Sequence, residues 1–202
     1  MSYTRDVAET LEKPMTIEAY LELEERSETR HEFVDGQLLA MAGETGEHEE
    51  IVFNIVAALR PIAQARGCRL RGPSVKLRVS GQRYRYPDVY VVCAPRPNDP
   101  RLEENPCFIV EVLSPSTAAT DRIAKLDEYT SLASLQRYVL IEQDRRFVIV
   151  YRRTLEGWLY QTFKDGVIDV PCLETMLSLD QMYAGLEFNG LVDPISENEN
   201  TS

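Results

Sequence analysis

Two stretches near the middle of the chain are apolar at almost every position. Residues 88–93 read Asp-Val-Tyr-Val-Val-Cys, and residues 107–113 read Cys-Phe-Ile-Val-Glu-Val-Leu. Short runs of β-branched and aromatic residues favour strands, and a continuous apolar run is typical of a strand covered on both faces. We therefore predict two buried strands, each of which carries one carboxylate, Asp88 or Glu111.

These two carboxylates need a partner, because an ionised carboxylate is costly to remove from water unless it is paired or bound to a metal ion. Side chains alternate along a strand, so Asp88 shares a face with Tyr90, and Glu111 shares one with Ile109. If the strands are neighbours, the carboxylates converge, and Mg²⁺ is often held by only one or two carboxylates. The pattern thus predicts a divalent-metal site. The alternatives are that Asp88 caps a turn and that Glu111 pairs with a buried Arg or Lys.

The remaining pattern predicts an α/β protein with a mixed central β-sheet flanked by helices. Helical periodicity indicates a helix at 16–26 capped by Thr16, and a longer one at 47–66 that Pro61 should kink or interrupt and Gly67 should end. Asp35-Gly36 between apolar pairs predicts a hairpin at 33–39. Further strands are expected at 74–80, 137–142, 147–152 and 157–163, with a helix after 114–117 and a short one near 179–183.

Two lysines are candidates for a cation beside the carboxylates. Lys125 lies in the helix that follows the second buried strand, where it shares a face with Asp121. It could instead simply bridge Asp121 or Asp127. Lys76, on the polar face of the strand at 74–80, is its rival.

Several short motifs occur in a specific order along the chain. They are Glu32-Phe33-Val34-Asp35-Gly36, Tyr86-Pro87-Asp88-Val89, Ile109-Val110-Glu111-Val112-Leu113-Ser114-Pro115-Ser116-Thr117, then Asp121, Lys125 and Tyr129, then Tyr138-Val139-Leu140 and Val150-Tyr151-Arg152-Arg153. Together they resemble the Uma-type family of restriction-endonuclease-like proteins, which belongs to the PD-(D/E)xK nuclease superfamily. The likeness runs from about residue 15 to about residue 163.

This resemblance implies a restriction-endonuclease-like core and a metal site of Asp88 and Glu111. It also implies a lysine two residues beyond the Glu, where this chain has Leu113. Some superfamily members supply that lysine from a nearby helix, a role that Lys125 fits. The backbone carbonyl of Val112 is implied as a further metal ligand.

Two more side chains are candidates for the same site. Glu32 opens the first strand of the hairpin and is either a third acid of the site or a surface carboxylate beside His31. His48 lies in the first turn of the long helix, where the family resemblance implies a residue that faces the site. It would contact phosphate or a bound water there, and the alternative is a purely structural histidine.

The implied function is hydrolysis of phosphodiester bonds in nucleic acid, DNA in particular, with Mg²⁺ or Mn²⁺ as cofactor. A net charge of −11, from 22 basic and 33 acidic residues, weighs against it, since affinity for a phosphate backbone comes mainly from Lys and Arg. Arginines and lysines between residues 66 and 85 form a local basic run, which is either a binding surface or a solvated strand face. The alternative function is a catalytically silent nucleic-acid-binding or assembly module on the same fold, and a homodimer is possible.

The 202 residues are enough for one domain, expected at 14–188 between flexible tails at 1–13 and 189–202. No apolar run is long enough to cross a bilayer and no signal peptide is evident, so we expect a cytoplasmic protein. The four cysteines show no metal-ligand spacing along the sequence, and three lie in or beside apolar strands. We therefore expect buried free thiols in a reducing compartment.

Overall fold

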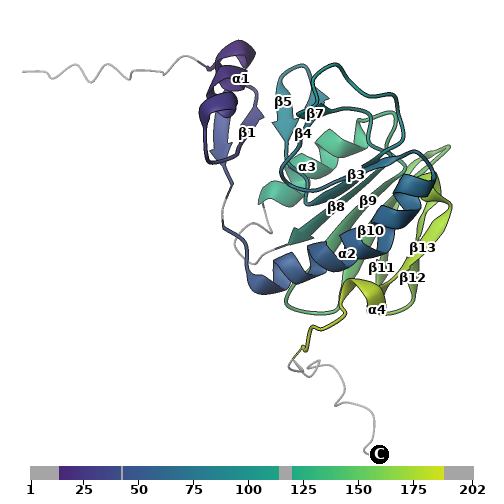
Figure 1. Ribbon diagram of the computed structural model, residues 1–202. Coiled ribbons are helices and arrows are strands. Elements are labelled where there is room, and N and C mark those ends of the chain that lie inside the picture. Colours follow the sequence, from purple (N-terminus) through teal and green to yellow (C-terminus); the bar gives the residue numbers. More distant parts are fainter. Residues whose placement is uncertain (1–13, 42, 114–119, 189–202) are drawn as a thin grey trace, which may run out of the picture.

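The computed structural model of the chain describes residues 14–41, 43–113 and 120–188, without the side chains of 120–123 (Figure 1). The tails predicted at 1–13 and 189–202 and the turn at 114–117 lie outside the described residues.

The described chain forms helices and three β-sheets. In chain order the elements are α1 (Ile17–Arg26), β1 (His31–Val34), β2 (Gln37–Ala40), α2 (Gly46–Ala65), β3 (Arg69–Arg71), β4 (Lys76–Ser80), β5 (Arg83–Arg85), β6 (Val89–Val92), β7 (Leu102–Glu103), β8 (Phe108–Leu113), α3 (Thr120–Thr130), β9 (Arg137–Glu142), β10 (Val148–Thr154), β11 (Gly157–Phe163), β12 (Val167–Val170), the 3₁₀ turn η1 (Pro171–Leu173), β13 (Thr175–Ser178) and α4 (Leu179–Met182). The strand orders are β11-β10-β9-β8-β6-β3, β2-β1-β5-β4-β7 and β12-β13. The large sheet is mixed, since β8 and β9 are parallel whereas β6 and β8 are antiparallel.

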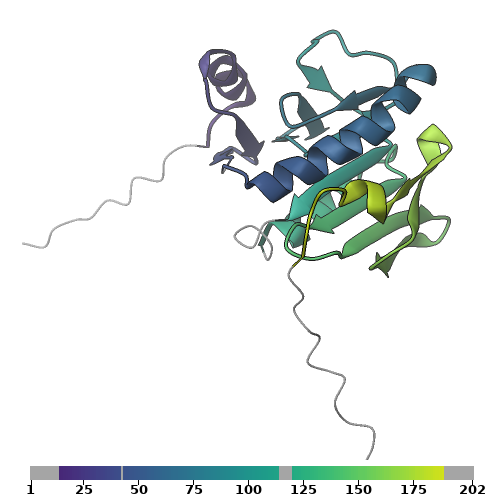
Figure 2. The same cartoon turned by 60° about the horizontal axis from the view of Figure 1, so that its bottom comes forward.

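The six-stranded sheet is covered on both faces. Helix α2 lies along one face with α4 beside it, and their apolar side chains pack on residues such as Val110 and Val139 (Figures 1 and 2). On the other face, Tyr129 of α3 packs against Tyr138, and Leu77 of β4 belongs to the same core cluster. Alternate residues of β6 and β8 therefore point into two different cores, which is why both strands are almost wholly apolar.

The small sheet has a core of its own. Tyr20 of α1 stacks on Phe33 of β1, with ring centroids 4.8 Å apart, and Tyr84 of β5 closes the cluster. Thr16 caps α1 as predicted, because its hydroxyl accepts a hydrogen bond from the Ala19 N–H. This core fixes the hairpin β1–β2 against β5.

The predicted elements agree with the structure at most positions. Gly67, with φ of +69°, ends α2 as predicted, since the N–H groups of Gly67 and Cys68 bond to carbonyls of the last turn. Pro61 does not interrupt α2, which stays helical to Ala65. The small hairpin β12–β13 was not predicted.

The prediction of free thiols is wrong, because Cys68–Cys93 and Cys107–Cys172 are disulfide-bonded. Strands β3 and β6 are antiparallel with Arg69 opposite Val92, so the next pair outward is Cys68 and Cys93. Apolar flanks predicted burial, which holds for Cys68 and Cys107 but not for the exposed Cys93. The flanks carry no information on which strands are neighbours.

The tight turn of the first hairpin supplies a test of this architecture. Gly36 has φ of +91°, and an added Cβ would lie 2.5 Å from the Cβ of Pro14. Gly36→Ala should lower the free energy of unfolding by about 1–3 kcal/mol, because alanine is strained at positive φ and also clashes. Urea unfolding measures this, with Gly81→Ala as control, since its added methyl meets nothing within 4 Å. Equal stability of the two variants would contradict the turn geometry.

Candidate active site

The register of β6 and β8 brings the two predicted metal ligands together. Val89 pairs with Val110 and Tyr90 with Ile109, so the next pair outward is Asp88 and Glu111. Directly opposite residues of an antiparallel pair project from the same face of the sheet. The two carboxyl-bearing residues are each only 6% exposed.

Asp88 is held by a backbone amide and by an imidazole. Its Oδ2 accepts a hydrogen bond of 2.7 Å from the Val112 N–H and lies 3.2 Å from Nε2 of His48. Burial lowers the pKa of this imidazole, but the hydrogen bond and charge of Asp88, with smaller contributions from Glu44 and Glu111, raise it above the usual value. The site therefore favours the imidazolium form of His48.

The side chain of Glu111 projects from β8 toward α3. Its Oε1 accepts hydrogen bonds from the hydroxyl of Tyr129 at 2.8 Å and from Nζ of Lys125 at 3.2 Å. Burial raises the pKa of Glu111 to about 7, although the nearby ammonium opposes the rise. This carboxyl group therefore titrates near neutral pH.

Lys125 stands between two acids, 3.2 Å from Glu111 and 3.6 Å from Glu32. Burial alone lowers its pKa, whereas the negative charges of Glu111, Glu32 and Asp88 together raise it above the usual value. Lys125 therefore keeps its charge, and it is this lysine that lies beside the acids. Lys76 lines a separate cavity instead, with its Nζ 5.5 Å from the ring centroid of Tyr20.

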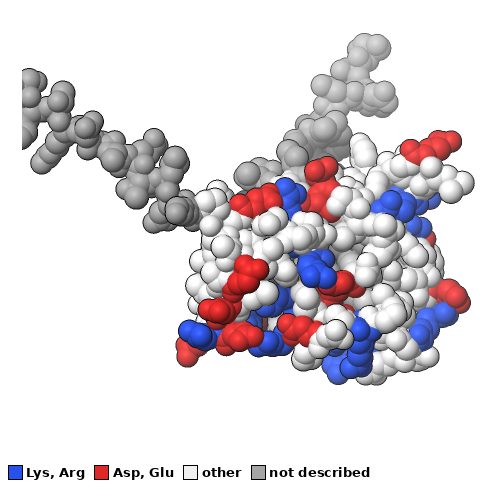
Figure 3. Space-filling model, turned by 90° about the horizontal axis from the view of Figure 1, so that it is seen from above, with Lys and Arg blue, Asp and Glu red and all other residues white. Residues whose placement is uncertain are grey.

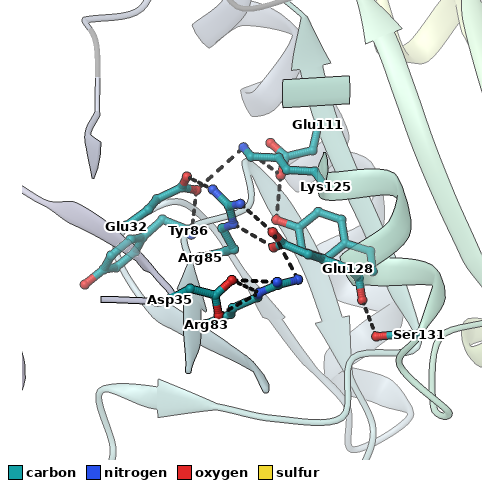
Figure 4. A network of polar contacts seen from close by, with 10 residues as sticks. Glu32, Asp35, Arg83, Arg85, Tyr86, Glu111, Lys125, Glu128 and Ser131 are labelled. Carbon is teal, nitrogen blue, oxygen red and sulfur yellow. Dashed lines mark hydrogen bonds and ion pairs between the residues drawn. The ribbon is translucent and has the colours of Figure 1, made fainter. Parts of the chain in front are cut away.

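Glu32 is not a surface carboxylate beside His31. It is buried, accepts a hydrogen bond of 2.6 Å from Arg85, and also accepts one from the Tyr86 N–H. Arg85 in turn binds Glu128 of α3 through two bonds of 2.7 and 2.8 Å. Figure 4 shows this network between the hairpin and α3. Removal of one member of such a buried network costs about 3–5 kcal/mol, because a charge is left without its partner.

All the predicted site residues line one cavity of about 280 Å³. Its polar lining comprises Glu32, Glu44, His48, Asp88, Glu111 and Lys125, and Val112 borders it as well. The carboxyl groups outnumber the basic groups, which favours a bound cation. Sequence reasoning missed Glu44, which lies 3.5 Å from Nε2 of His48; the spacing of four residues at the start of α2 is a signal that could have found it.

The carboxylates retain ligand capacity toward the cavity. Within the described part of the chain, hydrogen bonds engage Oδ2 of Asp88 and Oε1 of Glu111 but neither Oδ1 nor Oε2. The N–H and C=O of one strand residue point to the same side, so the Val112 carbonyl faces the side of Asp88, beyond the end of the β6–β8 ladder. Two carboxylate oxygens and a carbonyl are the donors that Mg²⁺ or Mn²⁺ prefers.

Comparisons with known proteins identify the family of the chain. The sequence profile of the Uma2 family, described as "Putative restriction endonuclease", matches residues 17–181. An uncharacterized protein of Synechocystis sp. is 32% identical over 175 residues, which are 85% of this chain and 92% of the relative. A second one is 32% identical over 136 residues, 65% of this chain and 76% of the relative.

A solved structure shares the fold. A crystal structure of a protein from Anabaena variabilis, described as a "putative nuclease belonging to DUF820", superposes with a TM-score of 0.70 at 21% identity and covers 84% of this chain and 98% of its own. The predicted fold class and the family resemblance are thereby confirmed. No helix in the described ranges is long and apolar enough to span a membrane.

The buried carboxyl group of Glu111 predicts a pH dependence of stability. Its pKa is about 7 in the folded chain against an ordinary 4.5, so the folded chain binds more protons between these values, and a rise in pH through this window lowers the free energy of unfolding. Glu111→Gln cannot titrate and should lose less stability between about pH 5 and about pH 8 than the wild type does. Urea unfolding in EDTA at both pH values measures the difference.

Each protein is compared with itself at the two pH values, so the pH-independent effect of the substitution on the free energy of unfolding cancels. Glu22→Gln, on the exposed side of α1, is the control and should keep the wild-type dependence. If Glu111→Gln also keeps it, Glu111 is not the titrating group.

Proposed function

Because this chain belongs to the Uma2 family, we propose that it is a metal-dependent nuclease that hydrolyses phosphodiester bonds in DNA. The proposal rests on one observation above all. Asp88 and Glu111 lie opposite each other on neighbouring strands, with the ammonium of Lys125 3.2 Å from Glu111, in one cavity. The nuclease descriptions of the family and of the Anabaena protein support the reaction class.

The metal ligands we propose are Oδ1 of Asp88, Oε2 of Glu111 and the carbonyl of Val112. A bound Mg²⁺ or Mn²⁺ supplies polarisation of a phosphoryl oxygen and a lowered pKa for a coordinated water. In this proposal Asp88 is oriented by its bonds to the Val112 amide and to His48, so that its second oxygen is directed to the cavity.

Lys125 has the second role in the proposed mechanism. Its ammonium orients the attacking water and stabilises the negative charge that develops on the phosphate in the transition state. Glu111 and Glu32 hold the ammonium in place, and Arg85 donates a hydrogen bond to the other carboxylate oxygen of Glu32. Tyr129 restrains Glu111 through the same oxygen that Lys125 contacts. His48, as the imidazolium, donates to Asp88 and adds positive charge where a phosphate would enter.

A second candidate function is a catalytically silent nucleic-acid-binding or assembly module. Leu113 occupies the position where the superfamily pattern has its lysine, and the chain carries a net charge of −11. On the face seen in Figure 3, basic and acidic side chains are interspersed, without a continuous basic surface. These features favour weak or indirect contact with nucleic acid. The homodimer and the cytoplasmic location stay predictions.

Removal of the charge of either acid should strongly reduce cleavage. Asp88→Asn and Glu111→Gln keep the side-chain shape but remove the charge that holds the metal, so we expect a loss of about 10²-fold or more. Cleavage of plasmid and single-stranded DNA with Mg²⁺ or Mn²⁺ measures it, and Glu22→Gln is the control with unchanged activity.

Cleavage that survives both substitutions would rule out this mechanism. If the wild type itself does not cleave but shifts DNA in a gel in the presence of Ca²⁺, the binding module is the correct function. If it neither cleaves nor shifts DNA, the nuclease and the nucleic-acid-binding module both fail, and an assembly module without a nucleic-acid role is left.

Substitution of the two buried lysines separates their roles. Lys125→Met should reduce cleavage by about 10²–10³-fold while metal binding persists, because the lost group acts on the phosphate rather than on the ion. Lys76→Met removes a buried lysine from another cavity and should leave cleavage unchanged. The opposite ranking would assign the cationic role to Lys76.

A further inference from the structure

The four cysteines of the chain converge at the end of β6 and β8 that lies away from the acids. Asp88 precedes β6 and Cys93 follows it, whereas Cys107 precedes β8 and Glu111 lies near its end. Because the strands are antiparallel, Cys93 and Cys107 meet at the opposite end of the pair. Their sulfurs are 3.8 Å apart.

The other two cysteines join this pair from elements that flank the sheet. Cys68, between α2 and β3, is bonded to Cys93, and Cys172, in η1, is bonded to Cys107. Among the described residues, Cys93, Cys107 and Cys172 form the one group of potential ligands whose donor atoms all lie within 4.8 Å of one another. The sulfurs of these three cysteines are thus already gathered on a scale that one metal ion can bridge, and Cys68 lies outside this group but is bonded to Cys93.

The spacing fits a tetrahedral zinc site. Zn–S bonds of about 2.3 Å place the sulfurs of a tetrahedral four-cysteine site about 3.8 Å apart. This is the distance between the sulfurs of Cys93 and Cys107, which are not bonded to each other. Four thiolates are soft donors that select zinc over the hard cations preferred by the acids. The two sites therefore differ in chemistry as well as in place.

Burial and exposure are also suited to such a site. Cys68 and Cys107 are only 9% and 7% exposed, so their thiolates would be shielded once metal is bound. Cys93 is exposed, which gives metal ions and oxidants access to the cluster. A spacing of 25, 14 and 65 residues hides the cluster from sequence motifs, because its members come together only through strand pairing and the C-terminal hairpin.

We propose that the reduced chain binds one Zn²⁺ through Cys68, Cys93, Cys107 and Cys172, and that the two disulfides are the metal-free, oxidised form. Oxidation of four thiolates to two disulfides releases four electrons and the Zn²⁺. Two molecules of a low-molecular-weight disulfide, such as glutathione disulfide, accept these electrons and become four thiolates. In either state the cluster ties η1 and the segment between α2 and β3 to the β6–β8 pair.

Metal analysis and spectroscopy test the proposal on the full chain. Chain reduced with a phosphine and dialysed against Zn²⁺ should retain one equivalent, and Co²⁺ in its place should give the thiolate charge-transfer and ligand-field bands of a tetrahedral four-sulfur site. Cys93→Ser and Cys107→Ser should weaken Zn²⁺ binding at least 10-fold. Glutathione disulfide should release the metal from the wild type and leave no free thiol.

Asp88→Asn/Glu111→Gln is the matched control, because it removes the proposed nuclease ligands and should keep the zinc. The Co²⁺ spectrum of the wild type reports the thiolate ligands even if a cysteine variant does not fold. Reduced wild type that binds no Zn²⁺, a Co²⁺ spectrum without thiolate bands, or zinc lost in the Asp88/Glu111 variant would each overturn the proposal. None of these results bears on DNA cleavage.

Discussion

The antiparallel pairing of β6 with β8 is the constraint on which the rest of the structure depends. One register sets Asp88 opposite Glu111 at one end of the pair and Cys93 near Cys107 at the other. A slip of one residue would move every side chain of a strand to the opposite face. The apolar residues between the ends prevent such a slip, because alternate positions fill two different cores. The packing of the apolar residues therefore also sets the positions of the acids and the cysteines at the two ends of the strand pair.

Ion pairs hold in place the charged side chains that the strand register brings together. Burial penalises every ionised group in the cavity, yet Glu111, Lys125, Glu32 and Arg85 form a chain in which each charge has an opposite neighbour. Such a chain adds little net stability compared with apolar packing, but it holds its members in one arrangement. Burial raises the pKa of Glu111 to about 7, so the nearby positive charge of Lys125 offsets only part of the cost of burying this carboxylate. A cation bound there would offset the remaining penalty.

Sequence reasoning reached the strands and the two acids because local patterns mark them, whereas Lys125 was a candidate through the family resemblance and Lys76 stayed open as its rival. Continuous apolar runs marked the buried strands, and one charge within each run marked the site. Sequence reasoning missed Glu44 because its contact with His48 matters only through Asp88. Asp88 is a residue that lies far from both in the sequence. The disulfides escaped for the same reason, since they depend on which strands are neighbours. Local sequence thus predicts which residues are unusual, and tertiary pairing decides what each one meets.

The network of Arg85 with Glu32 and Glu128 has a consequence for how such a protein can change over time. The three residues come from β5, β1 and α3, and the one guanidinium of Arg85 binds both carboxylates. A neutral residue in place of Arg85 would take the closest basic partner from two buried carboxylates, and replacement of one glutamate would leave the guanidinium with a single acidic partner. A change at Arg85 therefore costs least when both glutamates change with it, although more than forty residues separate Arg85 from either one.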